Sequence, residues 1–176
     1  MDKTALVVID MQAAMFAEEE KPYRGQEVLE NILLLLNKAR ETNMPVVFVQ
    51  HNDDGGFKKD TALWQVCPEI FPAPGEARVD KTTRDSFYQT ELDGILRRLE
   101  IKTLIFCGMQ TEYCVDTTCR RAYTLGYGAY LASDGHTTFD SKVLPASQIV
   151  AHHNHVLPTR FLQVITSKEL LEMMGE

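Results

Sequence analysis

Six short strand-like segments alternate with helix-forming segments, and this alternation limits the fold more than any other feature of the sequence. The strand-like segments cover residues 4–10 ("TALVVID"), 45–50, 76–80, 103–108, 128–133 and 161–166. Most are continuously apolar, which is typical of strands buried on both faces. Helical patterns cover residues 27–44, 90–101, 113–127, 145–153 and 167–174. The order predicts an α/β fold: a three-layer α/β/α sandwich around a doubly wound, mainly parallel six-stranded sheet.

Local signals place the ends of several helices. Thr90 is the predicted N-cap of one helix, with Asp93 as its capping-box acid, and Ser167 is the predicted cap of the last helix. Gly126 is expected to stop the helix that begins near residue 113. Residues 51–86 are too many for a plain connection, so we expect them to form a wall or lid of the site.

Composition fits one soluble globular domain spanning residues 1–176. Hydrophobic residues make up 44% of the chain and charged residues 24%, and the formal net charge is −7. That charge argues against nucleic-acid and anionic-membrane partners. The first apolar run is too short for a secretion signal or a membrane span, and the four cysteines form no CxxC pair. We therefore expect a cytoplasmic protein with reduced thiols.

Three chemically active side chains follow strand-like segments. Asp10 closes the first, Lys81 follows residues 76–80, and Cys114 lies at an expected helix start. Ligands of open parallel sheets bind beyond the carboxyl ends of the strands, so these side chains are the first candidates for a site. Each also has a plain structural interpretation: a turn cap, a solvated lysine and a small buried hydrophobe.

The three residue types make chemical sense together. A thiol must lose a proton before it attacks, and a nearby carboxylate can accept that proton. A lysine beside both favours the thiolate and keeps the carboxylate ionised, and a helix N-terminus favours the thiolate further. Periodicity alone does not prove that the three meet.

The sequence resembles the isochorismatase-like cysteine hydrolases, which include nicotinamidases, N-carbamoylsarcosine amidases, ureidoacrylate amidases and biuret hydrolases. The matching stretches are "ALVVIDMQ", "VDKTTRDSFYQTELDGILRRLEIKTLIFCGMQTEYCVDTTCRRAYTLGY" and "SDGHTTFD", in family order. The resemblance implies an Asp10–Lys81–Cys114 triad. It also implies a cis peptide bond between Met109 and Gln110, before Thr111. The backbone amides of Gln110 and Cys114 would then form an oxyanion hole.

Further residues are expected around the substrate. The predicted pocket comprises Gln12, Phe16, His51, Trp64, Thr111 and His136. For the aromatic residues ordinary packing is the alternative, and for His136 it is hydrogen bonding within a loop. By the resemblance, Gln12 orders the first loop.

A metal is not expected, and no cofactor is predicted. Nicotinamidases carry an Asp-x-His motif that holds a metal, whereas this chain has "VQHNDDGG" around His51. Polar residues in a Gly-rich loop are more often turn formers. For His152, His153 and His155, helix-end capping or pocket lining is favoured over a metal cluster.

The leading functional hypothesis is hydrolysis of a C–N bond (amide, carbamoyl or ureido) in a small molecule through a thioester on Cys114. One alternative is a vinyl ether hydrolase of the isochorismatase type, and another is a non-catalytic binding domain on the same fold. The resemblance also implies a homo-oligomer, either a dimer or a tetramer. The substrate itself is not predicted.

Overall fold

The computed structural model of the chain describes residues 1–17 and 19–175. Six strands form one sheet in the order β3-β2-β1-β4-β5-β6, and all neighbouring strands run parallel. Their bounds are β1 (Thr4–Ile9), β2 (Val46–His51), β3 (Ala77–Lys81), β4 (Thr103–Met109), β5 (Gly128–Thr137) and β6 (Gln163–Ile165). The chain builds the sheet outward from β1 in one direction and then from β4 in the other. This switch point between β1 and β4 is where a ligand crevice is expected.

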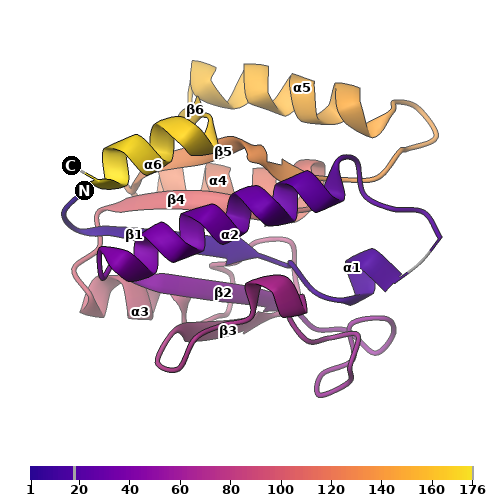
Figure 1. Cartoon of the computed structure of the whole chain (residues 1–176), viewed down its shortest axis with the longest axis horizontal. Helices are drawn as coiled ribbons and strands as arrows, with labels where there is room; N and C mark the ends of the chain where they lie inside the picture. Colours follow the sequence, from indigo (N-terminus) through magenta and orange to yellow (C-terminus); the bar gives the residue numbers. More distant parts are fainter. Residues whose placement is uncertain (18, 176) are drawn as a thin grey trace.

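Helices cover both faces of the sheet, which confirms the predicted three-layer fold. They are α1 (Ala14–Ala17), α2 (Gly25–Glu41), α3 (Leu92–Arg98), α4 (Asp116–Thr124), α5 (Ala146–Val156) and α6 (Ser167–Gly175). Shorter turns are η1 (Pro68–Ile70), the π-helical η2 (Thr111–Val115) and η3 (Leu157–Thr159). Helices α2 and α6 lie on one face and α3 and α4 on the other (Figure 1). Each pair buries an apolar core against the strands.

Two predicted helix caps are wrong. The N-cap of α3 is Glu91 and not Thr90, although the Thr90 hydroxyl accepts the Leu92 N–H at 3.3 Å. Asp93 forms no capping box with Thr90, and its carboxylate instead accepts hydrogen bonds from Arg97 and from the Tyr127 hydroxyl. At the last helix the cap is one residue earlier than predicted. Thr166 and Glu169 form the reciprocal pair there, with the Thr166 N–H donating to Glu169 at 2.8 Å and the Glu169 N–H donating to Thr166 at 3.2 Å.

Two elements near the predicted site also differ from expectation. The helix predicted from residue 113 begins as the π-helical turn η2, and regular α-helix starts only at Asp116. Strand β5 runs on to Thr137 through a register shift against β4, so His136 lies within a strand and not after one. Both differences lie at the carboxyl edge of the sheet.

The long connection between β2 and α3 is only partly irregular, because it contains η1 and β3. Its middle packs beside the segment that follows β1. The N–H groups of Ala13 and Ala14 donate to the carbonyls of Gln65 and Leu63, at 2.8 and 2.9 Å. The described part of the chain contains no helix that is long and apolar enough to span a membrane.

Candidate active site

Asp10, Lys81 and Cys114 meet at the carboxyl edge of the sheet. The Lys81 Nζ lies 2.6 Å from Asp10 Oδ2 and 3.2 Å from Cys114 Sγ. Its third short contact is the Thr83 carbonyl oxygen, at 3.1 Å. Asp10 and Lys81 are each 1% exposed and Cys114 is 4% exposed. An ion pair and a thiol are therefore held in direct contact, away from bulk water.

The sheet topology explains how three distant residues converge. Asp10 directly follows β1, Lys81 is the last residue of β3, and Cys114 lies in the turn after β4. Strand β2 separates β1 from β3, and the long Lys81 side chain crosses that distance to reach Asp10. The parallel arrangement puts all three strand ends at one edge.

Close contact between β1 and β4 depends on Gly108. A Cβ atom there would lie 2.0 Å from the Ile9 carbonyl oxygen, and the residue has a φ of +125°. Asp10 follows with a φ of +49°, in the left-handed region that non-glycine residues seldom adopt. Such conformations occur often at functional sites. This local geometry brings the Asp10 carboxylate to the turn that carries Cys114.

The surroundings of Cys114 favour the thiol over the thiolate, which its place near a helix start led us to expect. Burial, followed by the charge of Asp10, raises the pKa of Cys114 to about 12, and the charge of Lys81 opposes this only in part. The helix N-terminus is displaced as well, because η2 intervenes before α4. A thiol in this environment needs a base beside it before it can attack, and the Asp10 carboxylate lies next to the same Lys81 ammonium. The other cysteines are buried too, and burial raises the pKa of Cys67, Cys107 and Cys119.

The turn that holds Cys114 starts with a cis peptide bond between Met109 and Gln110. Gln110 itself is extended, and its carbonyl accepts hydrogen bonds from the N–H groups of Tyr113 and Val115. Those bonds fold residues 110–115 into a compact loop over the end of β4. The loop carries both residues whose amides are the predicted oxyanion hole.

His51 is the predicted pocket residue that reaches the triad. Its Nδ1 lies 3.5 Å from Lys81 Nζ, and its Nε2 lies 3.4 Å from an Arg84 nitrogen. Burial, followed by the charge of Lys81, lowers the pKa of His51. Arg84 was not predicted to be a site residue from the sequence. Its position three residues after Lys81 could have indicated that it lies near the same strand end. Its guanidinium lies 5.9 Å from the centre of the Tyr113 ring at the exposed margin of the site.

Gln12 is a structural group rather than a pocket wall. It is fully buried, and its Nε2 donates to the carbonyls of His51 and Trp64 at 3.1 and 2.9 Å. Its Oε1 accepts the His51 N–H at 2.8 Å. Gln12 thus ties the loop after β1 to the end of β2, consistent with the ordering role that the resemblance implies.

The contacts found for two aromatic residues predicted to line the pocket, Trp64 and Phe16, do not include the triad. Trp64 is 6% exposed, and the Lys59 ammonium lies over its ring, 5.8 Å from the ring centre. Phe16 packs with the core under α2 and lines a surface cavity of about 700 Å³ that contains no triad residue. Neither contact brings the ring to Cys114.

Thr111 belongs to the loop that carries Cys114, and its side chain contacts His136 of β5. The Thr111 hydroxyl is 2.9 Å from His136 Nδ1, and both residues are buried. One cavity beside His136 has a volume of about 30 Å³, enough for one water molecule. That cavity is too small for a substrate, and both ring nitrogens of His136 have protein partners.

The remaining histidines and the loop acids do not gather around a metal. Within the described residues, no group of three or more potential ligands is close enough to hold an ion. Asp53 closes a turn by accepting the N–H groups of Gly55 and Phe57. His152 and His155 are exposed, and His153 Nδ1 bonds to the Ile149 carbonyl within α5.

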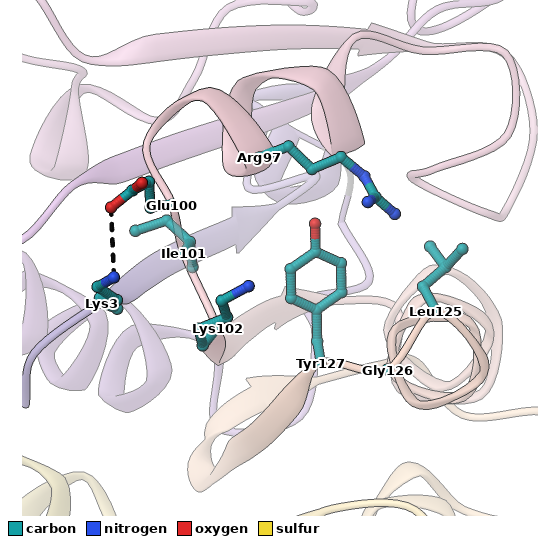
Figure 2. Close-up of a pocket in the computed structure, with 8 residues that line it drawn as sticks. All are labelled: Lys3, Arg97, Glu100, Ile101, Lys102, Leu125, Gly126 and Tyr127. Carbon is teal, nitrogen blue, oxygen red and sulfur yellow. Dashed lines mark hydrogen bonds and ion pairs between the residues drawn. The ribbon is translucent and has the colours of Figure 1, made fainter.

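A cavity lies at the edge of the sheet opposite the triad. Figure 2 shows this cavity of about 450 Å³, whose lining includes residues just before β1, β4 and β5. Two of its cations already have acidic partners, Lys3 with Glu100 and Arg97 with Asp93. We therefore assign the candidate active site to the carboxyl edge.

Comparison of the sequence with known proteins identifies the family to which the chain belongs. A family model described as the isochorismatase domain matches residues 4–169. The isochorismatase family protein YddQ of Bacillus subtilis is 31% identical to this chain, over 83% of this chain and 86% of YddQ. Nicotinamidase 3 of Arabidopsis thaliana is 29% identical, over 81% of this chain and 77% of its own length. The chain belongs to the isochorismatase family of hydrolases.

A solved structure supports the same assignment. The crystal structure of an isochorismatase from Pseudomonas putida KT2440 superimposes with a TM-score of 0.89 at 30% identity. The match covers 95% of this chain and 89% of that protein. The family includes relatives that act on C–N bonds, of which the nicotinamidase is one.

Proposed function

We propose that this protein is a cysteine hydrolase that cleaves the C–N bond of a small amide, carbamoyl or ureido compound. The observation that carries the proposal is the buried contact of the Lys81 ammonium with both Asp10 and Cys114. A buried ion pair is a weak contributor to stability, because desolvation offsets much of the attraction. A base, a cation and a nucleophile at one point therefore suggest chemistry more than support of the fold.

The first stage forms a thioester. Asp10 accepts the Cys114 proton while Sγ bonds to the substrate carbonyl carbon, and Lys81 holds the carboxyl group and the sulfur in position. The carbonyl oxygen becomes an oxyanion, which the amides of Gln110 and Cys114 receive. The C–N bond then breaks, and the proton on Asp10 passes to the departing nitrogen. Proton transfer of this kind contributes about 100- to 10,000-fold to a rate.

The second stage restores the enzyme. Asp10 takes a proton from water as the water oxygen attacks the thioester carbon, and the acid leaves as the C–S bond breaks. The proton returns to Cys114, which explains why a resting thiol with a raised pKa is compatible with turnover. A single carboxylate thus serves as base, then acid, then base again.

The vinyl ether hydrolase is the second candidate, because the similar Pseudomonas putida structure is that of an isochorismatase. Such a reaction has no need of a thiol nucleophile, whereas Cys114 lies in contact with the triad cation. That contact favours acyl transfer over vinyl ether cleavage. It also favours an enzyme over a non-catalytic binding domain on the same fold.

Turnover assays on matched variants test the proposal. The purified chain is incubated with a panel of primary amides, carbamoyl and ureido compounds, and with isochorismate. We expect release of ammonia or an amine from a member of the first group, and loss of that activity in Cys114→Ala. Cys119→Ala, which removes a fully buried thiol on the neighbouring helix, is the control and is expected to remain active. Activity on isochorismate alone, or unchanged activity in Cys114→Ala, contradicts the proposal.

We also propose a homo-oligomer, a dimer or a tetramer, that acts in the cytoplasm on a small molecule and binds neither nucleic acid nor membrane. The net charge of −7 supports the last point. Four free cysteines fit a reducing compartment. Sedimentation velocity of the purified chain measures the assembly, and a monomer across the concentration range contradicts it. Cell fractionation measures the location.

A further inference from the structure

A chain of hydrogen bonds, buried at Thr111 and partly buried at Asn154, links the Cys114 loop to β5 and α5. Thr111 Oγ1 lies 2.9 Å from His136 Nδ1, and His136 Nε2 lies 2.8 Å from Asn154 Oδ1. Asn154 Nδ2 donates in turn to the Ser133 carbonyl at 2.9 Å. Three elements that are distant in sequence are therefore joined by side chains: η2 through Thr111, β5 through His136 and α5 through Asn154.

The partners fix the direction of every bond in this chain. The Ser133 carbonyl only accepts, so it must face the amide NH2 of Asn154 and leave the amide oxygen toward His136. An amide oxygen also only accepts, so His136 Nε2 carries a hydrogen. In a neutral imidazole Nδ1 is then an acceptor, and it takes the hydrogen of the Thr111 hydroxyl.

His136 is placed to hold another residue and not to touch substrate. It is 2% exposed, and the cavity beside it has room for about one water molecule. Both of its ring nitrogens already have partners. Burial lowers the pKa of His136 to about 4, so the neutral form persists throughout the physiological range.

Thr111 occupies the point at which a displacement would matter most. It follows Gln110 directly and precedes Cys114 by three residues, and it is fully buried. Its carbonyl accepts the Asp116 N–H at the start of α4. A rotation of Thr111 would move the amides on both sides of it.

We propose that His136 is a positioning residue, whose neutral Nε2–H form anchors Thr111 and thereby aims the Gln110 and Cys114 amides at the substrate oxygen. This inference rests on the proposed hydrolase function for its kinetic consequence. Its structural part, the tautomer and the anchoring of the loop, is independent of any substrate.

A matched pair of substitutions separates the two bonds of His136. In His136→Asn the amide oxygen can stand where Nδ1 stands and accept from Thr111, while the bond to Asn154 is lost. In His136→Gln the amide nitrogen can stand where Nε2 stands and donate to Asn154, while the bond to Thr111 is lost. We expect kcat to fall in the glutamine variant by about 10- to 100-fold, the cost of small misplacements in an active site. The asparagine variant should keep most of kcat, and KM should change little in either.

Thr111 supplies a second pair that leaves the histidine intact. Thr111→Val removes the hydroxyl at nearly constant shape, and Thr111→Ser keeps it. The valine variant is expected to lose kcat as His136→Gln does, whereas the serine variant retains it. Equal kcat values within both pairs would overturn the proposal while leaving the hydrolase function standing.

Two readouts decide the structural part without turnover. Nitrogen-15 NMR of the full chain is expected to show His136 neutral and protonated at Nε2 between pH 5 and pH 8. Hydrogen exchange of residues 110–116 is expected to be faster in Thr111→Val than in Thr111→Ser. A hydrogen on Nδ1, or identical exchange in the two variants, rejects the anchor. If the wild-type chain turns over no substrate, the hydrolase function fails and these two measurements still decide the anchor.

Discussion

Removing Lys81 is expected to destabilise the fold more than the loss of a surface charge, because its partner remains buried. In Lys81→Met the Asp10 carboxylate, 1% exposed, loses the ammonium that lies 2.6 Å away. At an effective dielectric constant of about 20, two unit charges at that distance attract by about 6 kcal/mol. In the intact pair this attraction compensates the cost of desolvating the two charges. When Lys81 is removed, the desolvation cost of the Asp10 carboxylate remains and nothing compensates it.

The expected net cost is about 3–5 kcal/mol of unfolding free energy, the range found when one partner of a buried ion pair is removed. That is a large share of the roughly 5–15 kcal/mol that a typical domain possesses. The double variant Asp10→Asn/Lys81→Met lacks the unpaired charge. Its free energy of unfolding should therefore exceed that of Lys81→Met alone by more than about 1 kcal/mol. This non-additivity separates the charge effect from loss of the lysine side chain.

Urea unfolding measures both quantities. The single tryptophan, Trp64, is 6% exposed and reports unfolding by its fluorescence. Lys59→Met is the control, because Lys59 pairs with Asp80 at the exposed edge of the sheet and should change stability little. A Lys81→Met variant as stable as Lys59→Met, or a double variant less stable than Lys81→Met, would refute the reasoning.

Two other perturbations have defined outcomes. Because the folded pKa of His136 is about 4 and an unfolded histidine titrates near 6.5, the unfolded chain binds more protons between these values. Stability therefore falls as the pH drops from about 6.5 to 4, by about 3 kcal/mol from this group. Urea unfolding at several pH values measures how steeply the free energy of unfolding depends on pH. This dependence should be weaker in His136→Asn and unchanged in the control His155→Asn, which removes an exposed imidazole. An equal dependence in all three proteins would contradict the burial effect. Gly108→Ala places a Cβ 2.0 Å from the Ile9 carbonyl and should lower both thermal stability and activity, whereas Gly56→Ala, with no atom within 4 Å, should lower neither. A Gly108→Ala protein with the wild-type melting temperature would disprove the close contact of β1 and β4.

The fold was predictable because burial on both faces leaves a simple pattern in the sequence. Strands β1, β2 and β4 are buried along nearly their whole length and read as apolar runs. Parallel strands place their carboxyl ends together. The positions of Asp10, Lys81 and Cys114 after strands, together with the family resemblance, were therefore enough to predict that they form one site. Helix caps were less predictable. Asp93 had a competing partner in Tyr127, which lies 34 positions away in the chain.

The site details that sequence did not predict all depend on tertiary packing. Whether Trp64 faces the triad is decided by how residues 51–86 fold back over the sheet, and no local pattern encodes that. The protonation state of Cys114 depends on burial and on Asp10, which outweigh the helix end that a sequence suggests. His136 entered β5 through a register shift, which places its ring behind the loop and not at the rim.

The most direct test of the account is to trap the covalent intermediate. The wild-type chain is mixed with a substrate that it turns over, quenched in acid within the turnover time, digested and examined by mass spectrometry. The account predicts an acyl group on the peptide that contains Cys114, and none in the Cys114→Ala protein. Turnover that leaves this peptide unmodified at every quench time, together with undiminished activity in Cys114→Ala, would contradict it.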